Sequence, residues 1–287
     1  MKKQSLAVHQ FRALHESGCF VLPNPSDAGS AIYLEHLGFK ALATTSAGFA
    51  FSKGLPDAAV PREMMLEHFR EMAAATSLPV NADFRNGYAD DPEGVAANIA
   101  FCIATGVAGL SIEDSTGKKA KPLYDFDLGV ERIKAARAAI DSVSEPGAVA
   151  TGSSDSGVVL TARCEAWLCG DPDPLRTSLE RLTAYADAGA DCLYAPGVSK
   201  PDEIAAIVSA VSPKAVNVLV SRFNCDLSVS QLTDLGVRRI SVGSALAGVA
   251  WGAFIQAAKD IRGDGSFAGL AGAASAGDLN NLFLNRG

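Results

Sequence analysis

Short, almost continuously apolar segments alternate along the chain with longer segments whose apolar residues recur at helical spacing. One pattern appears four times, as a helix-like stretch, a glycine, two spacer residues and a short apolar run, at 34–46, 101–114, 185–196 and 232–243. The glycines stand where each helix should end, because the residue after a helix often adopts positive φ; they are Gly38, Gly106, Gly189 and Gly236. The apolar run after each glycine is typical of a strand buried on both faces.

Four further apolar segments complete a set of eight predicted strands, at 19–24, 78–83, 157–163 and 214–220. Predicted helices lie between them, at 61–76, 92–104, 126–141, 175–188, 201–210 and 243–262. Strands that alternate with helices predict parallel βαβ units, and eight such units predict a closed (β/α)8 TIM barrel. A doubly wound open sheet is the alternative, but no GxGxxG turn follows the first strand.

The 287 residues fit one domain of this kind, because α/β barrels reach this length without dividing. We expect a single barrel domain over residues 1–287. The segment 263–287 is rich in Gly and Ala, then helical in pattern, and it follows the eighth unit. We therefore expect it to be a C-terminal appendage that contacts another subunit.

Composition and charge exclude several classes of function. The formal net charge is −7, whereas a nucleic-acid binder needs a basic face. No run of about 18 apolar residues could span a bilayer, and the amino-terminal segment lacks the apolar core of a signal peptide. The cysteines show no CxxC pairing, which favours reduced thiols in a cytoplasmic protein. They are Cys19, Cys102, Cys164, Cys169, Cys192 and Cys225.

Polar side chains gather where the predicted strands end, and this face carries the active site of a (β/α)8 barrel. Asp83, Glu113 and Arg163 end three different strands, while all four histidines fall in predicted helices. Carboxylates without histidine favour a hard cation such as Mg²⁺, which needs only one or two of them; Mn²⁺ is possible. A metal held by Asp83 and Glu113 could chelate a 2-oxo acid, and Arg163 could stabilise a carboxylate or enolate. The alternative is a salt-bridged ring with a structural role alone.

Several segments together resemble the isocitrate lyase/phosphoenolpyruvate mutase superfamily, from about Phe20 to Ala250. They are 22–57, 79–95, 109–114, 160–167 and 241–246, together with Asn217. The resemblance implies a (β/α)8 barrel that uses Mg²⁺ on 2-oxo acids or their precursors and breaks or forms C–C or P–C bonds. It also implies a homo-oligomer, a dimer or tetramer, in which the last helix is swapped between subunits.

The resemblance also assigns roles to individual residues. The loop after the second strand would hold a substrate carboxylate on N–H groups, and the residues expected there are Thr45, Ser46 and Ala47. The expected metal-site residues are Asp57, Asp83 and Glu113. The remaining expected catalytic or substrate-binding residues are Asn81, Glu113, Arg163, Tyr194 and Asn217.

Four departures separate this chain from the superfamily pattern. The loop 114–122 lacks the lyase cysteine and has Ala120 in its place, so the candidate acids or bases are Tyr194, Lys118, Lys119 and Lys121. No Asn in 114–124 is available to guide a phosphoryl group. Asn81 replaces the first metal-binding Asp, and Arg85 and Asn86 stand where acidic or small residues are usual.

The sequence therefore predicts a Mg²⁺-dependent enzyme that cleaves a C–C bond of a small 2-oxo or 2-hydroxy dicarboxylate through a metal-stabilised enolate. Such an enzyme would be a lyase or an oxaloacetate-type hydrolase or decarboxylase. P–C chemistry on phosphonopyruvate and a non-catalytic barrel that binds 2-oxo acids are the alternatives. A phosphate-binding barrel is another, because SVGSALAG (241–248) resembles a phosphate cup.

Overall fold

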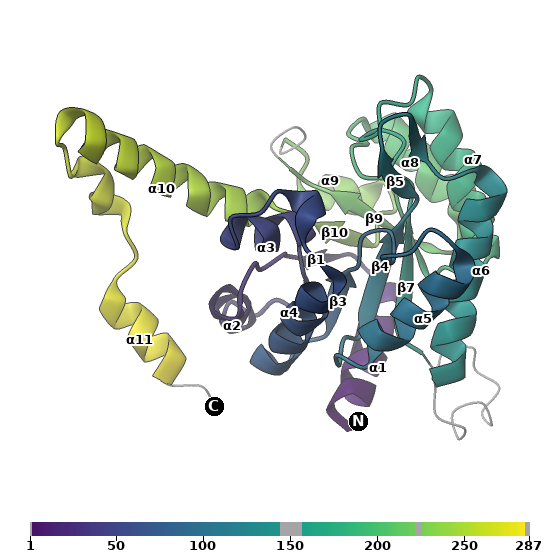
Figure 1. Cartoon of the computed structure of the whole chain (residues 1–287), viewed down its shortest axis with the longest axis horizontal. Helices are drawn as coiled ribbons and strands as arrows, with labels where there is room; N and C mark the ends of the chain where they lie inside the picture. Colours follow the sequence, from purple (N-terminus) through teal and green to yellow (C-terminus); the bar gives the residue numbers. More distant parts are fainter. Residues whose placement is uncertain (1, 144–156, 222–225, 285–287) are drawn as a thin grey trace.

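The computed structural model describes residues 2–143, 157–221 and 226–284. In these residues, eight parallel strands form one sheet in the order β1-β10-β9-β8-β7-β4-β3-β2, which curves into a nearly closed barrel (Figure 1). The strands are β1 (Phe20–Leu22), β2 (Leu42–Ala43), β3 (Val80–Asp83), β4 (Gly109–Glu113), β7 (Val159–Arg163), β8 (Cys192–Tyr194), β9 (Ala215–Leu219) and β10 (Arg239–Ser241). The predicted (β/α)8 architecture is confirmed.

Two hydrogen bonds link the end strands of the sheet, β1 and β2. The Ala43 N–H donates to the Pro23 carbonyl oxygen at 3.1 Å, and the Asn24 side-chain amide donates to the Thr44 carbonyl oxygen at 2.9 Å. These bonds connect the carboxyl ends of β1 and β2, the two strands at the ends of the sheet order.

Helices cover the outside of the sheet (Figure 1). They are α2 (Ala28–His36), α4 (Arg62–Ala75), α5 (Pro92–Ile103), α6 (Phe126–Val143), α7 (Pro174–Asp187), α8 (Pro201–Val211) and α9 (Val229–Asp234). Side-chain caps fix several helix starts, since Asp27, Asp91, Asp173 and Ser228 each accept a first-turn N–H. No helix in the described ranges is long and apolar enough to cross a membrane.

The four glycines singled out in the sequence do end helices. Gly38, Gly106, Gly189 and Gly236 have φ of 84°, 96°, 101° and 86°, a conformation that residues with a Cβ rarely adopt. Each one reverses the chain into the next buried strand, as the repeated pattern predicts.

The barrel is closed at the amino ends of its strands by α1 (Lys2–Glu16). Phe11 of this helix is fully buried among Phe20, Ala108 and Val159. A Cβ at Gly109 would lie only 2.5 Å from Phe11 Cε1 and 2.7 Å from Asn81 Oδ1, so glycine is required there for close packing. The open end of the barrel is therefore the carboxyl end, where the predicted site lies.

Shorter elements surround that open end. The loop after β2 carries α3 (Ser46–Ser52) and the short helix η1 (Asp57–Ala59). A two-stranded antiparallel hairpin follows β4, made of β5 (Ser115–Lys118) and β6 (Lys121–Leu123). Both segments connect a strand to the next helix of the barrel.

The C-terminal part of the chain leaves the barrel. Helix α10 (Ala245–Asp264) extends away from it, and η3 (Ala268–Gly272) and α11 (Ala276–Leu284) follow (Figure 1). The helix predicted at 243–262 is present, but it does not cover the outside of the barrel as the preceding helices do. Only Ala247 of α10 is buried.

One histidine lies in the core without a polar partner. His68 of α4 is 2% exposed, and its ring stacks on Phe49 of α3 with the ring centroids 3.9 Å apart. Neither ring nitrogen has a hydrogen-bond partner in the described part of the chain. Burial, aided by the charge of Lys53 and opposed by Asp27, lowers the pKa of His68 to about 4.

We expect His68 to make the fold sensitive to acid. The unfolded chain takes up this proton near pH 6.5 and the folded chain only near pH 4, so stability falls as the pH drops between these values. A pKa shift of this size lowers the free energy of unfolding by about 3 kcal/mol once the pH is below both values. His68→Leu should flatten the dependence of Tm on pH in this window. His36→Gln, at an exposed position of α2, should keep the wild-type slope. An unchanged slope in the His68 variant would assign the acid sensitivity to other groups.

Candidate active site

Three predicted residues meet at the carboxyl end of the barrel. Asp83 ends β3, Glu113 ends β4 and Arg163 ends β7, and Glu113 and Arg163 are opposite each other in the register of their strands. One guanidinium nitrogen of Arg163 donates to Asp83 Oδ1 at 2.8 Å, and the other terminal nitrogen lies 3.3 Å from Glu113 Oε2. The structure thus brings together the two carboxylates and the arginine that the sequence expected to converge.

A third carboxylate, Glu165, also binds Arg163 and was not among the predicted site residues. Its Oε1 accepts from Arg163 Nε and lies 2.9 Å from the terminal nitrogen that faces Glu113. The Asp114 carboxylate accepts the Glu165 N–H at 2.9 Å and holds the turn in place. The sequence does show a glutamate two residues after the arginine that ends β7. It does not show which way the turn between them folds, and so it does not show that this glutamate reaches Arg163.

Burial controls the protonation of these acids. It raises the pKa of Glu165 to about 8; Arg163 opposes this rise, whereas Glu113 and Asp114 add to it. Burial also raises the pKa of Glu113, with Arg163 opposing and Asp83 reinforcing the rise. Burial lowers the pKa of Arg163, but the carboxylates Glu165, Glu113 and Asp83 outweigh it and raise that pKa. The site can therefore hold a proton near neutral pH while the arginine stays charged.

The loop after β2 places a helix N-terminus against Asp83. The Ser46 N–H donates to Asp83 Oδ2 at 2.9 Å, and the Thr44 hydroxyl accepts the Asp83 N–H at 2.9 Å. The Thr45 hydroxyl caps α3 by accepting the Gly48 N–H at 3.2 Å. Ala47 follows in the first turn, where N–H groups have no intrahelical acceptor. The Ser46 N–H at this N-terminus therefore binds one carboxylate, that of Asp83, whereas the binding of a substrate carboxylate by Ser46 and Ala47 stays a prediction.

Asp57 lies in η1 at the rim of the site. Partial burial and the negative charge of Asp83 raise its pKa, while Arg85 and a hydrogen bond from Ser46 lower it. Arg85 also opposes the rise in the pKa of Glu113, so its positive charge acts on the same cluster. Its guanidinium donates to the Ala58 carbonyl oxygen at 3.0 Å and is thereby tied to this rim.

Tyr194 and Asn217 complete the floor of the site from β8 and β9. The Arg163 guanidinium lies 5.1 Å from the centre of the Tyr194 ring. Burial raises the pKa of Tyr194 to about 12, opposed by the charge of Arg163 and by a hydrogen bond from Ser241. The Asn217 amide donates to the Ser241 hydroxyl at 2.9 Å. Both predicted residues are buried and lie in one connected layer.

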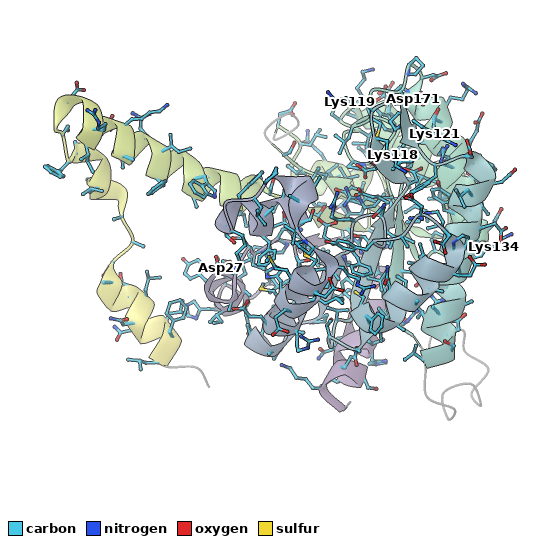
Figure 2. All side chains as sticks on the ribbon, viewed as in Figure 1. Asp27, Lys118, Lys119, Lys121, Lys134 and Asp171 are labelled. Atoms are coloured by element: carbon cyan, nitrogen blue, oxygen red, sulfur yellow. The ribbon has the colours of Figure 1, made fainter. Side chains whose placement is uncertain are left out.

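The three candidate lysines lie on the β5–β6 hairpin instead. Figure 2 shows Lys118, Lys119 and Lys121 at the outer edge of the molecule. Lys118 pairs with Asp90 and Lys121 with Asp125, and all four of these side chains are more than half exposed. In this arrangement the lysines are solvated charges, whereas Tyr194 lies against Arg163.

The segment that resembles a phosphate cup is occupied by another side chain. Asn24 Oδ1 accepts the N–H groups of Val242 and Gly243 at 3.0 Å and 2.9 Å. These are two of the donors that a phosphate would use in such a cup, so the arrangement disfavours the phosphate-binding alternative. A closed barrel makes its first and eighth strands neighbours, so the predicted topology places Asn24 near this segment although 218 residues separate it from Val242; it does not show that the Asn24 side chain enters the cup.

The side chains of the site suit a hard cation in charge and in donor atoms. Its carboxylates are Asp57, Asp83, Glu113 and Glu165, against two guanidiniums, those of Arg85 and Arg163, so negative charge is in excess. The buried Oδ1 of Asn81 also has no hydrogen-bond partner in the described residues, but it lies beside Gly109 at the start of β4 and near Phe11 of α1, away from these carboxylates. However, no three His, Cys, Asp or Glu side chains among those residues converge as a ready-made metal cage. Any Mg²⁺ would thus take few ligands from the protein, as Mg²⁺ commonly does.

Comparison with known proteins agrees with this arrangement. The family model for phosphoenolpyruvate phosphomutase matches residues 11–262. The crystal structure of a proposed lyase/mutase from Burkholderia cenocepacia J2315 is 46% identical, with a TM-score of 0.91 over 99% of this chain and 97% of that chain. Oxaloacetate acetylhydrolase in complex with its product oxalate is 27% identical, with a TM-score of 0.82 over 97% and 94% of the two chains.

A sequence relative extends the same match. Rv1998c, an uncharacterized protein of Mycobacterium tuberculosis (strain ATCC 25618 / H37Rv), is 34% identical over 238 residues, which are 82% of this chain and 81% of the relative. The family match spans most of the barrel and includes every strand end described above. The chain therefore belongs to the phosphoenolpyruvate mutase family, within the isocitrate lyase/phosphoenolpyruvate mutase superfamily that its motifs resemble.

Proposed function

We propose that this protein cleaves a C–C bond in a small 2-oxo or 2-hydroxy dicarboxylate. The proposal rests on the position of Asp83 between two groups of donors, the Arg163 guanidinium on one side and the N-terminus of α3 on the other. The Asp83 carboxylate binds the Ser46 N–H through one oxygen and Arg163 through the other. A substrate carboxylate and an adjacent oxyanion would find the same two kinds of donor side by side. Oxaloacetate acetylhydrolase, a structural neighbour whose product is oxalate, supports this substrate class.

In this mechanism, the N–H groups of Ser46 and Ala47 hold a substrate carboxylate at the start of α3, where the helix dipole favours negative charge. For a 2-hydroxy substrate, a carboxylate of the Arg163 cluster would take the hydroxyl proton. The hydroxyl oxygen then forms a C=O bond, the C–C bond breaks, and its electron pair stays on the other product as an enolate.

The Arg163 guanidinium, which Glu113 and Glu165 keep in place, would face that negative charge once Asp83 has released its donor. Tyr194, next to Arg163, would return a proton to the product, and Asn217 holds the layer beneath it.

Asp83 and Glu113 are the residues that would hold Mg²⁺, with Asp57 at the rim acting through water. When bound, the cation would polarise the substrate oxygens and stabilise the enolate as a Lewis acid. Phosphonopyruvate chemistry has no supporting observation of its own here, because the loop 114–124 carries no Asn that could guide a phosphoryl group.

The direct test is a turnover screen of 2-oxo and 2-hydroxy di- and tricarboxylates, with Mg²⁺ and with chelator, read by NMR of the products. Release of a 2-oxo acid or oxalate that depends on Mg²⁺ supports the proposal. Turnover of phosphonopyruvate alone would replace it with P–C chemistry. Saturable binding of oxalate with no turnover across the screen would indicate a binding barrel.

Substitution of Arg163 and Asp83 separates a catalytic role from a structural one. Arg163→Lys keeps the charge but loses the planar fork, and we expect it to cost roughly 2–4 kcal/mol of transition-state stabilisation. Asp83→Asn should cost at least as much. A buried ion pair broken on one side would instead destabilise the fold by about 3–5 kcal/mol. Turnover and Tm are measured on the same variants. A much lower Tm with normal turnover per folded molecule would make both residues structural.

We expect Mg²⁺ to bind weakly alone and much more tightly together with oxalate. The reason is that Asp83 and Glu113 are both engaged by Arg163 and that Asn81 adds no charge. Titration calorimetry with and without oxalate measures the difference. Asn81→Asp is the informative variant, because the added charge should raise the affinity for Mg²⁺ in the absence of oxalate. Equal Mg²⁺ affinity of the wild type under both conditions would contradict this dependence.

We also propose that a second copy of the chain covers α10. Large apolar side chains of this helix and of the residue just before η3 are exposed, among them Val249, Phe254 and Phe267 at 71%, 62% and 66%. An apolar surface of this extent marks a contact with a partner. We expect a dimer or tetramer by light scattering, shifted toward monomer by Val249→Asp combined with Phe254→Asp. Gln256→Asp, an exposed polar position of α10, is the control and should keep the wild-type mass. A monomeric wild-type protein would rule out this contact.

A further inference from the structure

Three arginines carry positive charge into the barrel or to its mouth, and they differ in their partners. Arg163 is bound by three carboxylates. Arg239 of β10, deeper in the barrel, donates to neutral groups, the Asn217 side-chain oxygen at 2.9 Å and the Thr161 hydroxyl at 3.0 Å. Arg85, in the turn after β3, is half-buried at the rim of the candidate site and forms no ion pair within the described part of the chain. Of the three, Arg85 is therefore the one placed to take an anionic partner from outside.

The guanidinium of Arg85 has N–H groups to spare. An arginine side chain carries five N–H donors, and its planar fork matches the two oxygens of a carboxylate. One terminal nitrogen of Arg85 donates to the Ala58 carbonyl oxygen at 3.0 Å, which holds the guanidinium beside η1. Its positive charge also opposes the rise that burial causes in the pKa of Asp57 and of Glu113. The guanidinium thus lies near the carboxylate cluster without pairing with any member of it.

The turn 85–90, which carries this arginine, has an unusual backbone. Arg85 and Tyr88 have φ of 50° and 55°, although neither residue is glycine. The Arg85 carbonyl oxygen accepts the Glu113 N–H at 2.8 Å, so the turn is bound to the end of β4. Residues in such a conformation cost free energy, persist only where the surrounding structure imposes them, and are common at ligand-binding sites.

Two buried side chains impose this conformation. Arg132 of α6 donates to three carbonyl oxygens of residues 86–90, and Asn98 of α5 donates to the other two. The exposed fractions of Arg132 and Asn98 are only 2% and 4%. Every carbonyl oxygen from residue 85 to residue 90 therefore accepts a hydrogen bond. The turn is held in place before any ligand binds, and a group presented by such a turn loses little freedom on binding.

We propose that Arg85 binds the second carboxylate of the substrate and thereby makes the site selective for dicarboxylates. The inference rests on the proposed function for the first carboxylate, which binds at the N-terminus of α3. Arg85 is tied to η1, which follows α3 in the chain and packs against it, so the two positions are close together. A 2-oxo or 2-hydroxy monocarboxylate would fill the first position and leave Arg85 without its partner.

Two ligands that differ only at the far end test this assignment. Malate and 2-hydroxybutyrate share the 2-hydroxy carboxylate, but the fourth carbon is a carboxylate in the first and a methyl group in the second. Calorimetry with Mg²⁺ gives the affinity of the full-length protein for each of them. We expect the wild type to prefer malate by about ten-fold or more, because charge-assisted bidentate hydrogen bonds are strong. Arg85→Gln should reduce the preference to about two-fold or less by weakening malate alone.

Three further variants complete the series. Arg85→Lys keeps the charge without the fork and should keep only part of the preference. Arg85→Asn serves as a second neutral variant, because asparagine adopts positive φ more readily than most residues. Lys119→Gln is the matched control, since it removes the same charge from an exposed position of the β5–β6 hairpin and should keep the wild-type preference. The Tm of each variant shows that it is folded.

The outcomes separate this inference from the proposed function. An unchanged preference in folded Arg85→Gln and Arg85→Asn overturns the inference, as does a wild type that binds both ligands alike. Equal changes for malate and 2-hydroxybutyrate, together with tighter Mg²⁺ binding, also overturn it, because Arg85 would then only balance the charge of the cluster. If the preference depends on Arg85 but the screen finds no C–C cleavage, the inference stands and the proposed function fails. Cleavage of a dicarboxylate with a preference that is independent of Arg85 gives the reverse result.

Discussion

The candidate site depends on the ion pairs of one guanidinium. Arg163 binds Asp83, Glu113 and Glu165, which reach it from β3, from β4 and from the turn after its own strand. Three acids around one cation leave a surplus of negative charge in a buried place, where an unpaired charge is costly. Only a proton, the nearby Arg85 or an external cation can balance that surplus. Burial, to which Glu113 and Asp114 add, raises the pKa of Glu165 to about 8, so a proton on Glu165 can neutralise part of that surplus near neutral pH.

The two buried arginines of the barrel interior differ in the kind of partner that each one has. Arg163 is surrounded by carboxylates, which fix its position and keep it charged. Arg239 is surrounded by neutral acceptors, which cannot cancel its charge but must all orient their oxygen or nitrogen lone pairs toward it. The first arrangement provides electrostatic stabilisation at the mouth. The second arrangement fixes the direction of the hydrogen bonds around Arg239. A guanidinium donates and never accepts, so each of its neighbours must be an acceptor.

The sequence predicted the strands, the helix-ending glycines and the convergence of Asp83, Glu113 and Arg163, because each follows from local periodicity and from barrel geometry. It assigned Glu165 no role in the site, because a turn decides where that side chain goes. The local pattern did not predict that α10 leaves the barrel, because the sequence of an apolar helix is the same whether its own domain or another subunit covers it; only the family resemblance implied a swapped last helix. Arg239 could have been found. Adjacent residues of a strand face opposite sides, so one of Arg238 and Arg239 had to point into the barrel.

Under the proposed function, Asp83 would link the binding of substrate to the binding of a cation. In this structure its carboxylate takes both donors that a substrate carboxylate and oxyanion would use, the Ser46 N–H and the Arg163 guanidinium. A substrate that binds Ser46 must displace one Asp83 oxygen, and the freed oxygen then carries a lone pair and charge that a cation can neutralise. Conversely, a cation that draws Asp83 away exposes the N–H to substrate. Under the proposed function, each ligand would favour the other because each separates Asp83 from the Ser46 N–H, and by linkage each would raise the affinity for the other by the same factor.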